Sequence, residues 1–357
     1  MIIHVPAGAL TDFCAEIFQR VGSRPEEARA VAASLVEANL TGHDSHGVLR
    51  VPRYVDWVRS GDTVPNQTIA RLVDTPVIAV LDGRHGFGQI VAPEAVDIGV
   101  VKAKAAGLSA VALRNSGHVG RVGEWAERAA AAAMISIHFV NAAGSILVAP
   151  FGGVERRLST APFCVGIPRE GADPVVLDFA TSLVAEGKVN VASFGGKPLP
   201  PDALIGPDGA LSGDPALLYG PLDGEGHRNH ALGLGAIRAF GEHKGSGLAL
   251  ICELLGGSLT GNGATEPNRK FANGMFSLYL DPDQIDPSHV FDADMARYLA
   301  WFREAKVAPG EAVLTPGEPE RMARAKRMAT GVPLPEEAWE AILASARSVG
   351  VNGDPRS

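Results

Sequence analysis

The chain has 357 residues, of which 46% are hydrophobic and 20% charged, and its formal net charge at pH 7 is −8. This composition indicates a globular protein with a sizeable core, and an acidic balance without a basic stripe argues against nucleic-acid binding. We find no apolar run of about 18 residues and no basic segment before an apolar one at the N-terminus, so neither a membrane span nor a signal peptide is expected. The three cysteines are far apart and form no CxxC motif, which is typical of reduced thiols and predicts a cytoplasmic protein.

The N-terminal part of the chain has helical periodicity. Apolar residues predict one helix over residues 10–21, which Gly22 ends. The residues Ser23-Arg24-Pro25-Glu26 have the spacing of a capping box, so we expect a second helix that continues toward Gly42. These helices lead to a polar stretch, Thr41–Tyr54.

The polar stretch contains two histidines, an aspartate, a serine and two arginines within fourteen residues. If residues 46–50 form one helical turn, His46 and Arg50 are neighbours on one face. An arginine can hold a carboxylate with its planar fork, and a histidine can move a proton near neutral pH. The stretch therefore predicts a site for a small carboxylate substrate.

Two other interpretations of this stretch stay open. His43, Asp44 and His46 could be the ligands of a metal-dependent lyase or hydrolase, although no nearby cluster supplies a further ligand. Alternatively, Asp44 or Ser45 could cap a helix whose polar residues only face water.

Beyond residue 75, strand and helix patterns alternate. Strands are expected at 76–82, 108–113, 135–140, 174–177 and 277–280, and helices at 91–106, around 125–129, and at 248–259, 320–329 and 335–347. This alternation predicts an α/β protein. Residues 193–235 are rich in glycine and proline and are expected to form a long irregular excursion.

Two loops in this part of the chain carry further candidates. His118 follows a predicted strand and is a second acid–base candidate, the alternative being a loop histidine bonded to nearby backbone. Lys244 precedes a predicted helix start and suits an anion, unless it is simply solvated. Neither Gly86-Phe87-Gly88 nor Gly245-Ser246-Gly247 continues to the third glycine of a dinucleotide fingerprint, so a standard Rossmann domain is not supported.

Several segments, in the same order, resemble the malate/L-lactate dehydrogenase type 2 family over roughly residues 8–345. They are Ser45–Tyr54 (Ser-His-Gly-x-x-Arg-x-Pro-Arg-Tyr), Asn115–Gly120, Asn141 with Ala149–Gly153, Asp178–Ser182 with Glu186-Gly187-Lys188, His243–Leu250 and Pro316–Glu318. Ser159-Thr160-Ala161-Pro162 stands where the family commonly has Gly-Thr-Asn-Pro, and Ala161 cannot form the hydrogen bonds of an asparagine.

The resemblance implies an NAD(P)-dependent oxidoreductase of 2-hydroxy acids such as malate or lactate. Hydride would move between the nicotinamide and the α-carbon of the 2-hydroxy or 2-oxo acid; reduction of a cyclic imino acid is the alternative. The implied fold is an atypical, non-Rossmann NAD(P)-binding sheet domain at 76–279 plus a mixed helical domain from 1–75 and 280–357, in a homodimer. The particular acid and the choice of NAD or NADP stay open.

The resemblance also implies a set of site residues. His46 is predicted to be the proton donor, with His118 orienting the substrate oxygen. Ser45, Arg50 and Thr160 are the implied substrate-binding residues, and no metal is expected. The implied cofactor-binding residues are Asn141, Asp178, Phe179, Ala180, Thr181, Ser182, His243, Lys244, Pro316, Gly317 and Glu318.

Overall fold

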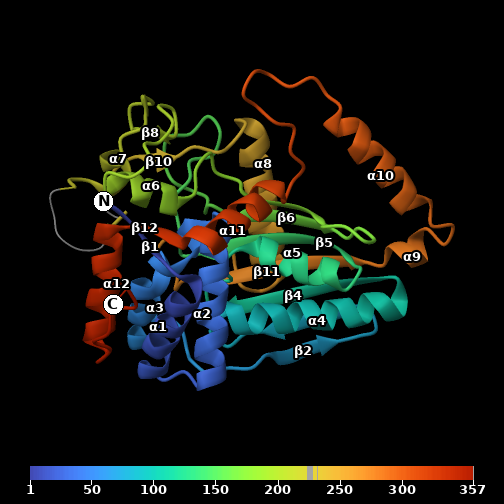
Figure 1. The fold of residues 1–357 in the computed structure, drawn as a ribbon, viewed down its shortest axis with the longest axis horizontal. Coiled ribbons are helices and arrows are strands. Elements are labelled where there is room, and N and C mark those ends of the chain that lie inside the picture. The colour runs from blue at the N-terminus through green and yellow to red at the C-terminus, as the bar shows by residue number, and fades with distance from the viewer. Residues whose placement is uncertain (223–227, 231, 357) are drawn as a thin grey trace.

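A seven-stranded sheet runs through the middle of the molecule (Figure 1). The structure is a computed structural model, and it describes residues 1–222, 228–230 and 232–356. The strand order is β2-β3-β4-β11-β5-β6-β7. Only β3 and β4 run parallel, and the other neighbours are antiparallel. The strands are β2 (Ala70–Asp74), β3 (Ile78–Asp82), β4 (Leu108–Ser116), β5 (Ile135–Ala143), β6 (Pro162–Ile167), β7 (Val175–Ala180) and β11 (Ala272–Leu280). The predicted α/β class is therefore confirmed.

Helices cover both faces of this sheet. Helices α4 (Gly88–Ala106) and α5 (Val122–Ala131) share one apolar core with alternate strand residues such as Val140. The next residue of β5 points to the opposite face, where Asn141 bonds Glu253 of the π-helix Glu253–Leu259. That π-helix continues α8 (His243–Cys252). The sheet is thus buried on both sides, which explains why its central strands are apolar.

The two ends of the chain share a second core. Helices α1 (Ala7–Arg20), α2 (Pro25–Leu40) and α3 (Val51–Ser60) pack with α12 (Glu336–Ser348) and with the strand pair β1 (Ile2–Val5) and β12 (Val332–Pro335). Figure 1 shows both termini at this end of the molecule. The domain limits at 75 and 280 stay predictions, although β2 joins the large sheet from residue 70.

The part of the predicted excursion over 193–235 that the structure describes is mostly irregular, as expected, but it contains a few short elements. Short elements follow α6 (Glu186–Ser193): β8 (Leu204–Ile205), β9 (Leu211–Ser212), α7 (Ala216–Tyr219) and β10 (Ala236–Ile237). The strands form a small sheet ordered β10-β8-β9 over a third apolar core. Two-residue strands leave no periodic signal, which is why the sequence did not reveal them. Residues 223–227 and 231 lie outside the described residues.

Two local predictions also need correction. The N-cap of α2 is Arg24, and Ser23 does not cap the helix but donates to the carboxylate of Glu27 at 2.7 Å. Lys244 lies inside the first turn of α8, whereas the sequence predicted that it would come just before the helix.

The segment that follows β11 contains α9 (Pro282–Ile285), α10 (Val290–Arg303) and α11 (Glu318–Thr330). Helix α10 stands away from the body of the fold in Figure 1, and Leu299 is its one buried residue. Within the described ranges, no helix is long and apolar enough to cross a membrane.

Candidate functional site

The polar stretch forms two 3-10 turns, Asp44–His46 and Val48–Arg50, that run into α3. Gly47 is extended between them, so residues 46–50 do not form the single helical turn that the sequence left as a condition. The side chain of Asn39 fixes this path, because it accepts from the Val48 N–H at 2.8 Å and donates to Asp44 at 2.7 Å. Asp44 also pairs with Arg327, and neither Asp44 nor Ser45 caps a helix.

This path places His46 against His118. The two imidazole rings are parallel, with 5.2 Å between their centroids and 1° between their planes. His118 arrives from the loop after β4, and the backbone of Gly88 passes so close to it that a Cβ would overlap the His118 carbonyl. A glycine is therefore required where α4 begins, because it lets the second histidine approach the first.

Both rings are neutral in the free protein. Burial, followed by the charge of Arg50, lowers the pKa of His46 to about 3. The same two causes and the neighbouring His46 hold the pKa of His118 well below its ordinary value. Nδ1 of His46 is buried without a hydrogen-bond partner among the described residues. Near neutral pH the pair therefore takes up a proton more easily when a bound anion changes its surroundings.

Arg50 is held beside this pair by two oxygens. Its Nε donates to the Ser45 carbonyl at 2.7 Å, and its Nη2 lies 3.5 Å from Oε2 of Glu186. The other Glu186 oxygen accepts from the Tyr219 hydroxyl at 2.7 Å. Burial raises the pKa of Glu186, but Arg50 and the Tyr219 hydroxyl outweigh it, so the net direction is downward and Glu186 carries its charge. Gly187 lets α6 approach this closely, because a Cβ there would overlap Ser45.

Sequence reasoning missed the contacts of Tyr54 and Gln89. The Tyr54 oxygen lies 2.6 Å from Nδ1 of His118, and Nε2 of Gln89 donates to that oxygen at 2.9 Å. Tyr54 closes the polar stretch, which was the one signal that could have found it. Half-buried Arg53 lies on the same helix, with its guanidinium carbon 5.9 Å from the Trp57 ring centroid.

The three residues of the metal interpretation do not converge. Nε2 of His43 lies 3.2 Å from Glu320, Asp44 pairs with Arg327, and His46 stacks on His118. In the part of the chain that the structure describes, no three histidine, cysteine or acidic side chains are grouped so that they could hold a metal. The geometry gives the lyase or hydrolase interpretation no ligand set.

Three of the predicted cofactor segments lie around β7. Ser182 forms a bridge with Ala239, and the Thr181 carbonyl accepts from the Phe240 N–H at 3.1 Å, so 178–182 lies beside the chain that enters α8. The Val176 N–H donates to Pro316 at 3.2 Å, which brings 316–318 to the same strand. Segments far apart in the sequence are therefore neighbours here.

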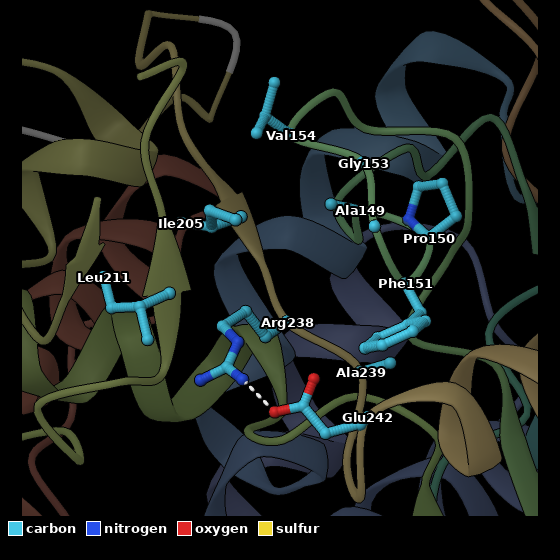
Figure 2. Close-up of a pocket in the computed structure, with 11 residues that line it drawn as sticks. Ala149, Pro150, Phe151, Gly153, Val154, Ile205, Leu211, Arg238, Ala239 and Glu242 are labelled. Atoms are coloured by element: carbon cyan, nitrogen blue, oxygen red, sulfur yellow. Dashed lines mark hydrogen bonds and ion pairs between the residues drawn. The ribbon is translucent and has the colours of Figure 1, made fainter. Parts of the chain in front are cut away.

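A pocket of about 210 Å³ borders the start of α8 (Figure 2). Residues 149–154 form one wall, Ile205 and Leu211 stand opposite, and the Arg238–Glu242 ion pair lies at one end. His243 and Lys244, which follow Glu242, are exposed. The two stacked histidines do not line this pocket, so it is separate from the proton-transfer candidates.

Other predicted residues are engaged within the protein. The Asn141 amide bonds Glu253 and the Gly263 carbonyl as donor, and Asn262 and the Gly274 N–H as acceptor. Any cofactor contact of this side chain would have to share those bonds. Oδ2 of Asp178 accepts from the Gly123 N–H at 2.7 Å, and burial raises the pKa of Asp178.

The segment that departs from the family pattern lies beside these residues. The Thr160 side chain is half-buried and has no hydrogen-bond partner among the residues described. Ala161 is fully buried, and its carbonyl accepts from both the N–H and the hydroxyl of Thr181.

Known proteins share this sequence and this fold. The family model described as malate/L-lactate dehydrogenase matches residues 5–343. Hydroxycarboxylate dehydrogenase B of Escherichia coli K12 is 38% identical, and the match covers 97% of this chain and 94% of that protein. Delta(1)-pyrroline-2-carboxylate reductase of Ancylobacter novellus is 31% identical over 95% of each chain. The solved structure of malate dehydrogenase from Pyrococcus horikoshii superposes with a TM-score of 0.83 at 30% identity, covering 99% of this chain and 97% of that one. The chain therefore belongs to the malate/L-lactate dehydrogenase family.

Proposed function

We propose that this NAD(P)-dependent 2-hydroxyacid oxidoreductase carries out its reaction between Arg50 and the stacked pair His46–His118. The observation that carries this proposal is the parallel contact of two half-buried neutral imidazoles, with ring centroids 5.2 Å apart, beside a guanidinium. A 2-oxo acid offers an anionic carboxylate next to a carbonyl, and the site offers a cation next to proton-transfer groups. The carboxylate of the substrate would thus face the guanidinium, and the adjacent carbonyl would face the proton-transfer groups.

Arg50 is the proposed carboxylate-binding residue. Its Nε is used by the Ser45 carbonyl, but the contact with Glu186 is long, at 3.5 Å, and leaves the Nη side able to form stronger bonds. Glu186 and Tyr219 would then act by holding the guanidinium in place. We include Ser45 and Thr160 as substrate-binding residues, since Ser45 abuts Arg50 and the Thr160 hydroxyl has no hydrogen-bond partner among the described residues.

His46 is the proposed proton donor in reduction and acceptor in oxidation. Arg50 is one cause of its low pKa, and a bound carboxylate would offset that positive charge and raise the pKa again. Substrate binding therefore makes protonation of His46 easier at the moment when a proton is needed. His118 would orient the substrate oxygen.

The start of α8 suits the phosphates of a dinucleotide. Lys244 is exposed and forms no ion pair within the described ranges, and it lies in the first turn, where the helix dipole favours anions. We propose His243, Lys244, the segment 178–182 and the turn 316–318 as cofactor-binding residues, in a non-Rossmann arrangement. We keep Asn141 as a cofactor-binding residue, although its amide would have to share its existing hydrogen bonds with the cofactor. When bound, the nicotinamide supplies or accepts the hydride at the substrate α-carbon.

A cyclic imino acid is the second candidate substrate. The pyrroline-2-carboxylate reductase relative favours it, and an imine carries the same carboxylate next to a C=N bond that also needs a proton. Arg50 and His46 would serve both substrates in the same roles.

We also propose that the protein is a cytoplasmic homodimer. Leu250, Ile251 and Leu254 are 51%, 42% and 46% exposed on α8 and the turn after it, so a second copy could bury them. All three cysteines, at positions 14, 164 and 252, are free and buried, as expected for a reducing compartment.

A substrate panel tests the proposal. Purified protein is assayed at 340 nm with NADH and with NADPH against pyruvate, oxaloacetate, longer 2-oxo acids and the five- and six-membered cyclic imino acids. Turnover of at least one 2-oxo acid or cyclic imine is expected. Absence of turnover across the panel, by protein that still binds NADH or NADPH, would contradict the proposed substrate class.

A further inference from the structure

A chain of two hydrogen bonds connects α4, α3 and the His118 loop. Gln89 donates through Nε2 to the Tyr54 oxygen at 2.9 Å, and that oxygen lies 2.6 Å from Nδ1 of His118. Gln89 and Tyr54 are 4% and 1% exposed, so the bond between them is shielded from water, and the bond from Tyr54 to His118 is partly buried. The Tyr54 ring also packs on Phe18 and Phe87, which fixes its position.

With the Gln89 amide oriented so that Nε2 faces Tyr54, the direction of the bonds follows from counting hydrogens. The Tyr54 oxygen already accepts the Gln89 N–H, and its single hydrogen can be donated in the other direction. Burial raises the pKa of Tyr54, so its hydroxyl keeps that hydrogen. The Tyr54 hydroxyl then donates to Nδ1 of His118, and a neutral imidazole that accepts at Nδ1 carries its proton on Nε2.

We propose that Gln89 and Tyr54 are positioning residues that lock His118 as its Nε2–H tautomer, so that His118 is a neutral hydrogen-bond donor to the substrate oxygen. The second clause rests on the proposed function, whereas the tautomer itself does not. His118 then polarises the substrate carbonyl, and the proton that is transferred passes through His46. The stacked pair thus divides two roles between two similar rings.

The opposite orientation of the chain makes the contrary prediction. If the Gln89 amide were reversed, Tyr54 would donate to Gln89 and accept from Nδ1–H, and His118 would present a bare Nε2 to the site. A bare nitrogen accepts a proton from a hydroxy acid, which would make His118 the base. The tautomer therefore separates the two assignments before any turnover is measured.

Nitrogen-15 NMR of histidine-labelled protein reads the tautomer directly, with His118→Gln used to assign the signal. We expect an unprotonated Nδ1 and a protonated Nε2 in the free protein. In Tyr54→Phe the signal should move toward a mixture of tautomers, and kcat should fall by about tenfold, the loss of one hydrogen bond, with a smaller change in KM. Tyr279→Phe is the matched control, because Tyr279 is equally buried but packs on His138 in the sheet; its His118 signal should equal that of the wild type.

Two results would overturn the inference. One is an Nδ1–H signal in the wild type, and the other is an unchanged pure Nε2–H signal in folded Tyr54→Phe. If Tyr54→Phe does not fold, Gln89→Met removes the donor to Tyr54, and the His118 signal should shift in the same direction. An inactive substrate panel with the expected tautomer would instead count against the proposed function alone.

Discussion

His46 and His118 stack face to face at 5.2 Å between ring centroids, although they are brought together from two different segments. Two half-buried imidazoles stacked at this distance resist being charged together, because each positive charge raises the free energy of the other. The site therefore handles one proton at a time, and the identity of the ring that holds it is the central question.

The pH dependence has a definite sign. Oxidation needs neutral His46, which is the form present above its pKa of about 3. The neutral form is therefore kept between pH 8 and pH 5, and titration of His46 should not lower kcat/KM for the hydroxy acid over that range. Reduction needs the protonated form, so its kcat/KM should fall about tenfold per pH unit as pH rises over that range. Initial rates in both directions check this. A step in the pH profile of the oxidation rate that is centred near the ordinary pKa of histidine, and that disappears in His46→Ala, would refute the low pKa of His46.

Arg50→Ala should raise KM by about tenfold or more, because a charged hydrogen bond to the carboxylate is lost in ground and transition states alike. Some loss of kcat should follow from poorer positioning. The change also leaves Glu186 buried without its partner, so Arg50→Ala combined with Glu186→Gln is the control: it should regain thermal stability and keep the high KM. A normal KM in Arg50→Ala would remove Arg50 from the site.

Lys244→Ala should weaken NADPH binding by about tenfold or more, the loss of one charged contact. Fluorescence titration of NADPH measures the dissociation constant. Lys104→Ala is the control, because Lys104 is also exposed but lies on α4, away from α8 in Figure 1. Equal affinities in both variants and the wild type would mean that Lys244 is only solvated.

The sequence predicted long helices and strands well, but it predicted poorly the short elements and the contacts between residues that are far apart in the chain. Helix α4 (19 residues) was predicted over residues 91–106 because a long run of helix-compatible residues ends at Gly107, whereas the two-residue strands β8, β9 and β10 are too short to show a pattern. His46, Arg50 and His118 were singled out because titratable side chains beside glycines are a local signal. The bonds of Tyr54 with Gln89 and of Arg50 with Glu186 span 35 and 136 residues, so only the fold could reveal those partners.

Light scattering at micromolar concentration should give about twice the chain mass of 37.2 kDa. If the exposed face of α8 forms the contact, Ile251→Glu should shift the mass toward the monomer, since a buried carboxylate would oppose association. Val101→Glu, at an exposed position on α4, should leave the dimer intact. A stable monomer of the unchanged protein would contradict the assembly and leave the chemistry untouched.

The turnover of His46→Ala and of His118→Ala, measured with the best substrate of the panel at saturating cofactor and compared with that of the wild type, tests the central claim most directly. Folding of each variant is checked by its thermal midpoint. We expect His46→Ala to lower kcat by about a hundredfold or more, the usual size of a general-acid contribution, and His118→Ala to have the milder effect and to keep the pH dependence. The reverse order would exchange the roles of the two histidines. Wild-type turnover in both folded variants would mean that the polar stretch is structural and that the reaction takes place elsewhere.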